Sequence, residues 1–420
     1  MNSVASIAAA LQGYDPQALS ADAVTAFLSR LVQPVSEQEQ VSIFQALGRV
    51  LACDVISPIN VPAHDNSAMD GYAFDGAQLS VSAPLSLSVV GTALAGAAWT
   101  GRVESGECIK IMTGAVMPPG LDTVVPQELV KAQGSTITIA AGLLARGDNR
   151  RKLGEDLLQG QTALAAGALL TPAALGLLAS LGLQSVAVWR KLRVAYFSTG
   201  DEILSLGEKP RQGAVYDSNR YTVFGLLTRL GCEVMDLGVV CDQPALLQGA
   251  LRQAAQADAI ITSGGVSVGE ADYTKTVMRE LGDVAFWKIA MRPGRPMAVG
   301  RIGNSVLFGL PGNPVAVMVT FLAFVRPALL QMMGSTSKAA PMLRARSLQA
   351  LRKKPGRTEY QRGVVDQAAD GSLQVRLTGN QGSGVLSSMV QANGLIVLHH
   401  AQGDVAAGDE VDVMMFDSAM

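Results

Sequence analysis

Between residues 193 and 333, short apolar runs alternate with segments whose apolar residues recur with helical periodicity. The runs "RVAYFSTG", "EVMDLGVV", "ADAIITSGG", "VAFWKIAM" and "SVLFGL" are typical of buried strands. The segments "SNRYTVFGLLTRLG", "PALLQGALRQAAQ" and "DYTKTVMRELG" are typical of helices, and a further helix is expected after "PGNP". Alternation at these lengths predicts a doubly wound α/β domain, a parallel sheet with helices on both faces. We assign this domain to residues 191–335.

The pattern differs on either side of this domain. Residues 51–145 and 340–420 contain short β-rich runs separated by turn residues, which predicts an N-terminal β-rich domain and a C-terminal β domain. Residues 1–50 and 146–190 are expected to form a helical linking domain. Ser20 is placed to cap one helix, and Ser36 to cap a second helix that would begin with a capping box.

Two apolar stretches raise the question of a membrane span. Residues 157–189 carry no charge, but glutamines, glycines and Pro172 interrupt them. Thr171 before Pro172 predicts a helix start, flanked by one or two strands. Residues 315–325 are strongly apolar but reach only about two-thirds of a spanning length. We therefore expect both stretches to be core. With no signal peptide recognisable at the start of the chain, we expect a soluble, cytoplasmic protein.

Composition excludes several classes of function. The 420 residues include 33 Lys+Arg and 35 Asp+Glu, a formal net charge of −2. This near balance gives no support to a nucleic-acid or membrane partner. The four cysteines are scattered and are expected to be reduced thiols, and none of the three histidines shares a stretch with a cysteine, so no zinc site is predicted.

Candidate binding residues follow the predicted strands. In a doubly wound sheet, ligands bind outside the carboxyl ends of the strands, so the five loops after them should meet at one edge. In chain order, these loops carry Glu202; Asp242; Ser263, Gly264, Gly265, Ser267 and Gly269; Arg292 and Arg295; and Pro311, Gly312 and Asn313. Lys275 and Lys288 add positive charge at the same edge.

The chemistry of this edge favours a metal-bound phosphate ester. Glycine N–H groups at a helix N-terminus can hold a phosphate, but such an end contributes only about 0.3–2 kcal/mol. Micromolar binding needs about 8 kcal/mol, so nearby cations must contribute. Glu202, Asp242 and Asp272 would repel the phosphate unless a metal bridged them to it, and hard oxygen ligands beside phosphate are typical of Mg²⁺.

Each of these features also has an ordinary structural explanation. Glycine-rich turns between strands and helices are common, the acids could cap helices, and the basic residues could be surface charges. "PGNP" could be only a rigid turn. It is the convergence of five loops that favours a binding site.

Three clusters outside this edge cannot be interpreted from propensity alone. "HDNSAMDGYAF" contains a predicted tight turn at Asp70–Gly71. "KIMTGAVMPPG" is a Gly/Pro loop, and "RRKLGEDL" is a basic run that ends in two acids.

Seven motifs together resemble one known family. "DNSAMDGYA", "IMTGA", "RRKLGED", "FSTGDE", "TSGGVSVGEADYTK", "FWKIAMRPGRP" and "GLPGNPV" occur in the order found in molybdopterin molybdenumtransferases, the bacterial MoeA proteins and the E domain of gephyrin-like proteins. The resemblance covers about residues 10–415. It implies a central molybdopterin-binding fold, insertion of molybdate into adenylylated molybdopterin with release of AMP, a divalent metal, and an elongated homodimer of four-domain subunits.

The resemblance also implies roles for individual residues. Asp70 and Thr113 would face the active cleft from the β-rich domain of the other subunit, with Asp156 near the domain junction. Lys288 and Arg292 would provide charge for molybdate or phosphate. Glu202, Asp242 and Asp272 would serve the metal and the phosphate end of the pterin. The C-terminal domain would contribute Arg362 and Ser383.

Two departures from the family pattern concern the oxyanion pocket. Relatives often have lysines where Arg292 and Arg295 stand here, and Arg and Lys are not interchangeable at such a site. Relatives also often carry a serine where this chain has Ala316.

Two other functions are consistent with parts of the sequence. A molybdopterin adenylyltransferase would need only the α/β unit, which leaves the rest of the chain unexplained. A gephyrin-like scaffold would need an additional domain and a long linker, and neither is recognisable here. Transient contact with other cofactor-synthesis proteins remains compatible with the sequence.

Overall fold

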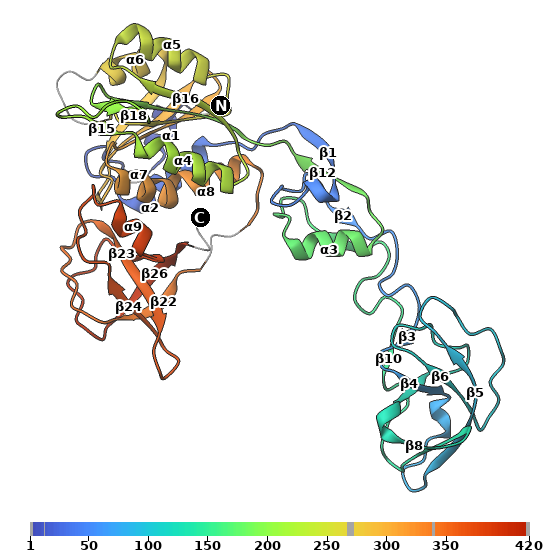
Figure 1. Cartoon of the computed structure of the whole chain (residues 1–420). Helices are drawn as coiled ribbons and strands as arrows, with labels where there is room; N and C mark the ends of the chain where they lie inside the picture. Colours follow the sequence, from blue (N-terminus) through green and yellow to red (C-terminus); the bar gives the residue numbers. More distant parts are fainter. Residues whose placement is uncertain (1–2, 12, 267–272, 338–340, 417–420) are drawn as a thin grey trace.

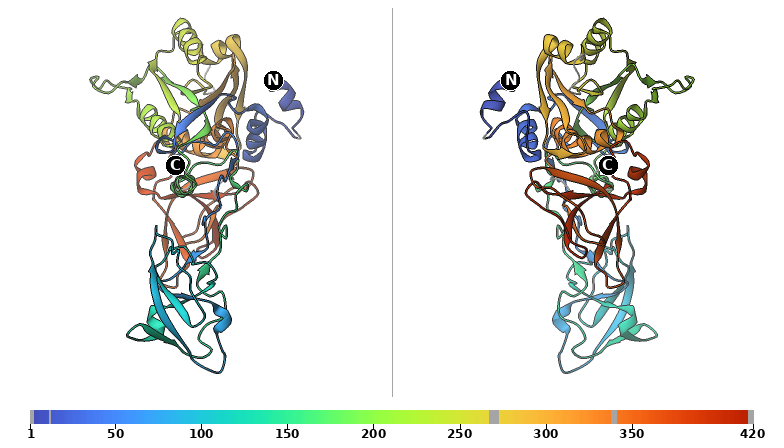
Figure 2. Two further views of the ribbon diagram at one scale, coloured as in Figure 1. Left: turned by 90° about the vertical axis from the view of Figure 1, so that its right-hand side faces the viewer. Right: turned by 90° about the vertical axis from the view of Figure 1, so that its left-hand side faces the viewer.

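The chain forms an elongated, bent molecule with two bodies joined by a narrow linking region (Figure 1). The computed structural model describes residues 3–11, 13–266, 273–337 and 341–416. The α/β domain and the C-terminal β domain lie together at one end, and the N-terminal β-rich domain lies at the other (Figure 2).

The α/β domain contains a six-stranded sheet in the order β16-β13-β17-β21-β20-β18. Its strands are β13 (Arg193–Thr199), β16 (Glu233–Val240), β17 (Ala259–Ser263), β18 (Gly282–Lys288), β20 (Pro296–Ile302) and β21 (Ser305–Leu310). β16, β13, β17 and β21 are neighbours in the sheet and pair in parallel, as predicted. β20, which was not predicted, is antiparallel to both β21 and β18, so β18 again runs in the common direction.

Helices cover both faces of this sheet and complete the doubly wound fold. They are α4 (Ser218–Arg229), α5 (Pro244–Ala254), α6 (Tyr273–Leu281), α7 (Pro314–Thr320) and α8 (Arg326–Met332). One apolar core lies between the sheet, α4, α7 and α8, and a second lies under α5 and α6. In the described part of the chain, one helix, Pro314–Met332, is long and apolar enough to cross a membrane. Because 67% of its apolar window is buried, we interpret it as the core helix that the sequence predicted.

The N-terminal helices pack against the α/β domain. α1 (Val4–Ala9) contributes Ile7 to its larger core, and α2 (Ala21–Leu31) contributes Phe27, which meets Trp287 edge-on at 4.8 Å between ring centroids. Ser20 caps α2, as predicted, by accepting from the N–H of Ala23. These first residues therefore lie with the α/β domain rather than with residues 146–190.

The linking region contains less helix than the sequence suggested. The predicted helix after Ser36 is wrong: the segment forms β1 (Gln38–Ser42) and a single turn of 3₁₀-helix, Ile43–Gln45. Pairing of β1 with β12 (Ser185–Trp189) overrides the weak local helix propensity, and Glu39 pairs with Arg49 instead of closing a capping box.

Within residues 146–190 the only helix is α3. α3 (Pro172–Ser180) begins after the Thr171 cap, as predicted, whereas the expectation of a generally helical segment is wrong. The rest is extended or irregular and includes β11 (Thr162–Leu164), which pairs with β2 (Val55–Ile56). A small core holds this region together and includes Leu51, Leu178 and Val188.

The β-rich domain at the far end is confirmed. Its sheet consists of β4 (Gly71–Phe74), β5 (Leu85–Ala93), β6 (Glu107–Ile111), β7 (Thr123–Pro126), β8 (Val130–Gln133) and β9 (Thr136–Ile139). β3 (Asn66–Ser67) pairs with β10 (Arg150–Arg151) beside it. The sheet packs against apolar cores around Ile109 and around Phe74.

The C-terminal domain is a β sheet that recruits a strand from the α/β domain. Its own strands are β22 (Leu343–Ser347), β23 (Thr358–Gln367), β24 (Leu373–Leu377), β25 (Gly394–Leu398) and β26 (Glu410–Met415), with α9 (Ser387–Gln391). β23 also pairs with β25, which curls the sheet into a barrel-like form. β19 (Met291–Arg292), in the loop after β18, pairs in parallel with β23 and ties the two domains together.

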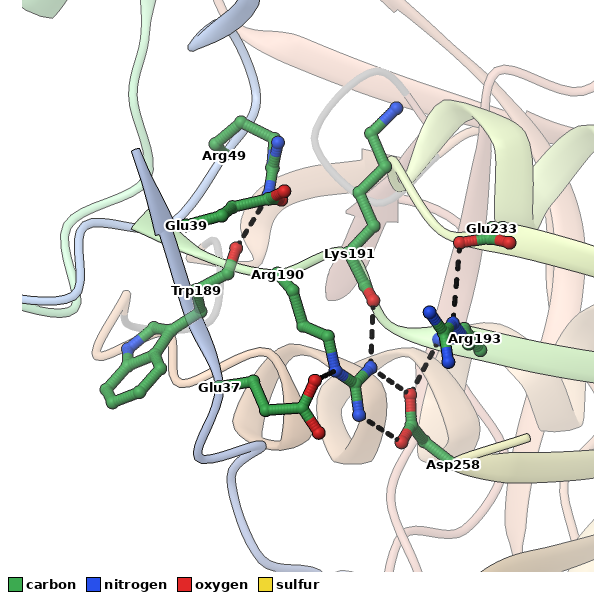
Figure 3. Close-up of polar contacts among 9 residues, drawn as sticks. All are labelled: Glu37, Glu39, Arg49, Trp189, Arg190, Lys191, Arg193, Glu233 and Asp258. Atoms are coloured by element: carbon green, nitrogen blue, oxygen red, sulfur yellow. Dashed lines mark hydrogen bonds and ion pairs between the residues drawn. The ribbon is translucent and has the colours of Figure 1, made fainter. Parts of the chain in front are cut away.

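Ion pairs stabilise the joint between the linking region and the α/β domain (Figure 3). Arg190 donates from its two terminal nitrogens to both oxygens of Asp258, at 2.7 and 2.8 Å, and from Nε to Glu37 at 2.9 Å. Burial disfavours the charge of Asp258, but the Arg190 guanidinium and the Arg193 N–H outweigh it, so the pKa of Asp258 is lowered.

Candidate active site

A cavity of about 720 Å³ opens where the strands of the α/β sheet end. All five predicted loops line it, so their expected convergence is confirmed. The loops contribute Thr199, Gly200 and Glu202; Asp242; Gly264, Gly265 and Val266; Met291 to Pro296; and Pro311, Gly312, Asn313 and Ala316. Arg357, Gln381, Gly382 and Ser383 line it from the C-terminal domain.

Two carboxylates, those of Glu202 and Asp242, are among the groups that line the cavity. Thr199 Oγ1 donates to Asp242 Oδ1, and the Asp242 N–H donates to Asp201 Oδ1 at 3.1 Å. The Glu202 carboxylate lies over Gly200, where an added Cβ would come within 2.6 Å of Oε2. Asp272, the third predicted metal ligand, lies outside the described residues, as do Ser267 and Gly269. The described residues contain no group of three or more His, Cys, Asp or Glu side chains placed to hold a metal.

The glycine turn after β17 has a backbone that other residues would strain. Gly264 and Gly265 have φ of +91° and +65°. A Cβ on Gly264 would lie 2.3 Å from the Thr199 carbonyl oxygen, and one on Gly265 would lie 2.6 Å from Thr274 Oγ1. Glycine is therefore required here by both conformation and space. The Gly264 N–H already donates to the Leu310 carbonyl at 3.2 Å, so this N–H supports the turn.

A buried network of hydroxyl groups supports the turn from below, and the sequence did not predict it. Tyr196 OH lies 2.8 Å from the hydroxyls of both Ser198 and Ser263. Asn219, in the first turn of α4, donates to the Gly312 carbonyl at 2.7 Å. Ser263 was predicted to bind the ligand, but it is only 3% exposed and does not line the cavity. It belongs to this buried network instead. In the same network the pKa of Tyr196 is raised, mainly by burial.

Two of the four predicted cations reach the cavity. Arg292 and Arg295 are exposed and line it, on the loop tied to β23. Lys288 does not line it; its N–H donates to the Pro16 carbonyl at 2.8 Å, at the end of β18. Lys275, on α6, lies 5.9 Å from the centre of the Phe286 ring and is also absent from the lining.

The C-terminal domain supplies one wall of the cavity. Ser383 lines it, and its carbonyl accepts from the Val315 N–H of α7 at 3.1 Å. Arg362 lies behind the wall, 1% exposed, and donates to Ser388 Oγ at 3.0 Å and the Gly382 carbonyl at 2.9 Å. Burial, with a smaller effect from Arg292, lowers the pKa of Arg362 to about 10.

Arg357 is the lining residue that sequence reasoning missed. Its neighbours "KKPGRTEY" follow no predicted strand of the α/β sheet, and only the β19–β23 pairing brings them to the cavity. A basic residue next to a turn in the predicted C-terminal β domain was the only available signal.

Asp70, Thr113 and Asp156 lie away from this cavity within the same chain. Asp70 is exposed in the β-rich domain, and one of its oxygens accepts from both the N–H and Oγ1 of Thr113 at 2.7 Å. These two bonds lower the pKa of Asp70. Asp156 is also exposed, and its N–H donates to the Val61 carbonyl at 3.0 Å.

The fold and the cavity define a multidomain α/β protein. Its pocket contains carboxylates, arginines and glycines and has one wall from a C-terminal β domain, and a separate β-rich domain lies at a distance. Three family models match consecutive parts of the chain: the MoeA N-terminal region (domain I and II) at residues 19–182, a probable molybdopterin binding domain at 195–331, and the MoeA C-terminal region (domain IV) at 344–416. The chain belongs to the MoeA family.

Whole-chain comparisons agree with this assignment. The chain is 44% identical over 385 residues to a molybdopterin molybdenumtransferase of Haemophilus influenzae, covering 91% of this chain and 95% of the relative. It is 32% identical to that of Bacillus subtilis, over 91% of each chain. The crystal structure of a molybdopterin biosynthesis MoeA protein from Pyrococcus horikoshii OT3 superposes with a TM-score of 0.82 at 26% identity, covering 95% of this chain and 100% of that one.

Proposed function

We propose that this protein is a molybdopterin molybdenumtransferase, a transferase of molybdenum cofactor biosynthesis that inserts molybdate into adenylylated molybdopterin and releases AMP. The observation that carries the proposal is the cavity, which gathers two carboxylates, a glycine turn and three arginines in a chain 44% identical to a molybdopterin molybdenumtransferase. We place this activity in the cytoplasm.

The residues of the cavity suit both substrates, the phosphate end of adenylylated molybdopterin and molybdate. The Gly264–Gly265 turn lines the cavity, and its backbone is the part of the site that would face the phosphate end of the pterin. Arg292 and Arg295 are placed to bind molybdate, since guanidinium groups match tetrahedral oxyanions. Lys288 and Lys275 lie off the lining, so this proposal gives them no direct contact.

The carboxylates of Glu202 and Asp242 fit a magnesium site. Both offer hard oxygen ligands next to the glycine turn, and Asp272 is the third proposed ligand. When bound, Mg²⁺ would neutralise charge on the phosphate linkage from which AMP departs. Thr199 holds the Asp242 carboxylate by its hydroxyl hydrogen bond, which orients this ligand. The remaining catalysis is positioning and charge neutralisation by the arginines.

We propose a homodimer in which the β-rich domain of one subunit completes the cavity of the other. Asp70 and Thr113 form an exposed hydrogen-bonded pair next to β4 and β6. These strands belong to the β-rich domain, which lies at the opposite end of the molecule from the α/β domain (Figure 1). If Asp70 contributes to the reaction, a second subunit must bring it there. Asp156 would lie near this junction.

Molybdate-dependent release of AMP tests the proposed function. Purified protein is given adenylylated molybdopterin, magnesium and molybdate, and both AMP and molybdenum cofactor are measured. We expect AMP release with molybdate, and a loss of at least about tenfold in Asp242→Asn, which keeps the shape but removes a metal ligand. Asp412→Asn, at a half-buried aspartate of the C-terminal domain that does not line the cavity, is the matched control.

Two outcomes of this assay would contradict the proposed function. Wild-type protein that releases no AMP in the presence of molybdate contradicts the proposal. Product formed from ATP and free molybdopterin by this chain alone would assign it the adenylyltransferase activity instead.

A further inference from the structure

Glu359 is a buried acid at the seam between the C-terminal domain and the cavity. It lies on β23, opposite Arg292 in the register of β19, and only 3% of its side chain is exposed. A buried carboxylate is costly unless it is paired and hydrogen-bonded, so its partners indicate what it does.

Its main partner is the arginine that lines the cavity from the C-terminal side. Arg357 Nε lies 2.8 Å and Nη2 2.7 Å from the same oxygen of Glu359. The other oxygen accepts from Gln361 Nε2 at 3.2 Å. Because a guanidinium has more N–H donors than this contact uses, Arg357 keeps donors for a ligand while its orientation is fixed.

Glu359 also lies among other cations. A small cavity behind the main one is lined by Arg292, Glu359 and Arg362 together. Three guanidinium groups (Arg292, Arg295 and Arg357) face the main cavity, and they repel one another when no anion is bound. A carboxylate behind them reduces this repulsion without occupying the space of the ligand.

We propose that Glu359 is a positioning residue, which holds Arg357 against the cavity so that the C-terminal domain helps to bind a tetrahedral oxyanion. The oxyanion is molybdate or the phosphate of the nucleotide, and its identity rests on the proposed function. The C-terminal domain thereby takes part in substrate binding in addition to its contact with the α/β domain.

A double-mutant cycle on oxyanion binding tests this role. The variants are Glu359→Gln, Arg357→Gln and the double variant, with sodium molybdate and AMP titrated separately by calorimetry. Arg357→Gln removes the counter-charge of Glu359 but keeps a hydrogen-bond donor for its buried carboxylate. We expect Glu359→Gln to weaken binding of one of the two anions about tenfold. In the Arg357→Gln background the same change should have little effect, because no guanidinium remains to be held.

The sign of this effect separates positioning from simple charge. Loss of a negative charge near the cavity would by itself tighten anion binding, whereas loss of positioning weakens it. In turnover, we expect a higher KM for molybdate, or for the adenylylated substrate if AMP is the affected anion, with a smaller change in kcat. Asp412→Asn, which removes the partner of Arg344 and His399 in the same domain, is the control and should change neither.

The outcomes either support or overturn the proposal. Weaker binding of molybdate assigns molybdate to Arg357, and weaker binding of AMP assigns the nucleotide phosphate. Unchanged or tighter binding of both anions, or equal effects in both backgrounds, overturns it, as does a fall in thermal stability that accounts for the whole loss. The proposed function is tested separately. If the wild-type protein shows no molybdate-dependent AMP release but the effects of Glu359→Gln and Arg357→Gln on anion binding depend on each other, the proposed function is contradicted and the role of Glu359 is not.

Discussion

At the scale of single residues, the cavity separates side chains that contact its space from side chains that hold them. Arg292 and Arg295 line it, whereas Ser263 and Arg362 lie behind it and fix neighbouring groups. The sequence could identify the lining residues that directly follow strands, because strand ends predict position. The sequence could not distinguish residues that line the cavity from residues that lie behind it, because the burial of a side chain depends on segments distant in sequence. Arg357 was missed for the same reason.

The Asp70–Thr113 contact gives a prediction about charge. Two donors of Thr113 lower the pKa of Asp70, so this carboxylate stays ionised to lower pH than an ordinary aspartate. Thr113→Val removes the hydroxyl donor but keeps the N–H, and should raise the pKa of Asp70 part of the way toward its usual value. NMR titration of the carboxyl carbon measures it. Thr138→Val, which removes a hydroxyl from a half-buried threonine on β9, is the control. An unchanged pKa in Thr113→Val would show that the hydroxyl contributes nothing.

At the scale of elements, most predicted strands and helices of the α/β domain are confirmed because each is a continuous apolar or periodic segment. β20 was missed, and the helix after Ser36 was wrong. In both places the conformation is decided by a partner strand: β21 and β18 for β20, and β12 for β1. Local sequence carries little information about such pairing.

The glycine turn gives a prediction at this scale. Gly264→Ala would place a methyl group against the Thr199 carbonyl as well as strain φ, whereas Gly213→Ala, at a similar φ of +80°, would meet nothing within 4 Å. We expect both variants to be less stable, with an additional loss of roughly 1–3 kcal/mol for Gly264→Ala. Thermal unfolding followed by circular dichroism compares them, and equal midpoints would contradict the steric explanation.

At the scale of the whole molecule, the ion pairs of Arg190 connect the linking region, which carries the β-rich domain, to the α/β domain. Arg190→Met removes the contacts with Asp258 and Glu37 and should broaden the distribution of molecular dimensions in small-angle X-ray scattering. Arg193→Met, which removes an exposed ion pair within the α/β domain, is the control. If both variants scatter like the wild type, the ion pairs do not hold the joint.

The same joint predicts a dependence on pH. The pKa of Asp258 is lowered in the folded protein, so its contribution to stability is complete above the ordinary aspartate pKa and is lost as the pH falls through the lowered value. We therefore expect the scattering of the wild type to approach that of Arg190→Met only under acidic conditions. Asp258→Asn should remove this dependence.

The proposed dimer predicts complementation between inactive variants. If Asp70 of one subunit serves the cavity of the other, mixing Asp70→Asn with Asp242→Asn creates one intact site in each heterodimer. After subunit exchange we expect about a quarter of wild-type activity, because about half of the dimers are mixed and each has one intact site of two. AMP release by the mixture measures it, and activity no higher than that of the separate variants would contradict a shared site.

A crystal soaked with molybdate and AMP tests the central claim most directly, since molybdenum is located by its anomalous scattering. The account predicts molybdenum in the cavity, within contact of Arg292, Arg295 or Arg357, with the AMP phosphate at the Gly264–Gly265 turn. Molybdenum and AMP bound elsewhere, with this cavity empty at saturating concentrations of both, would contradict it.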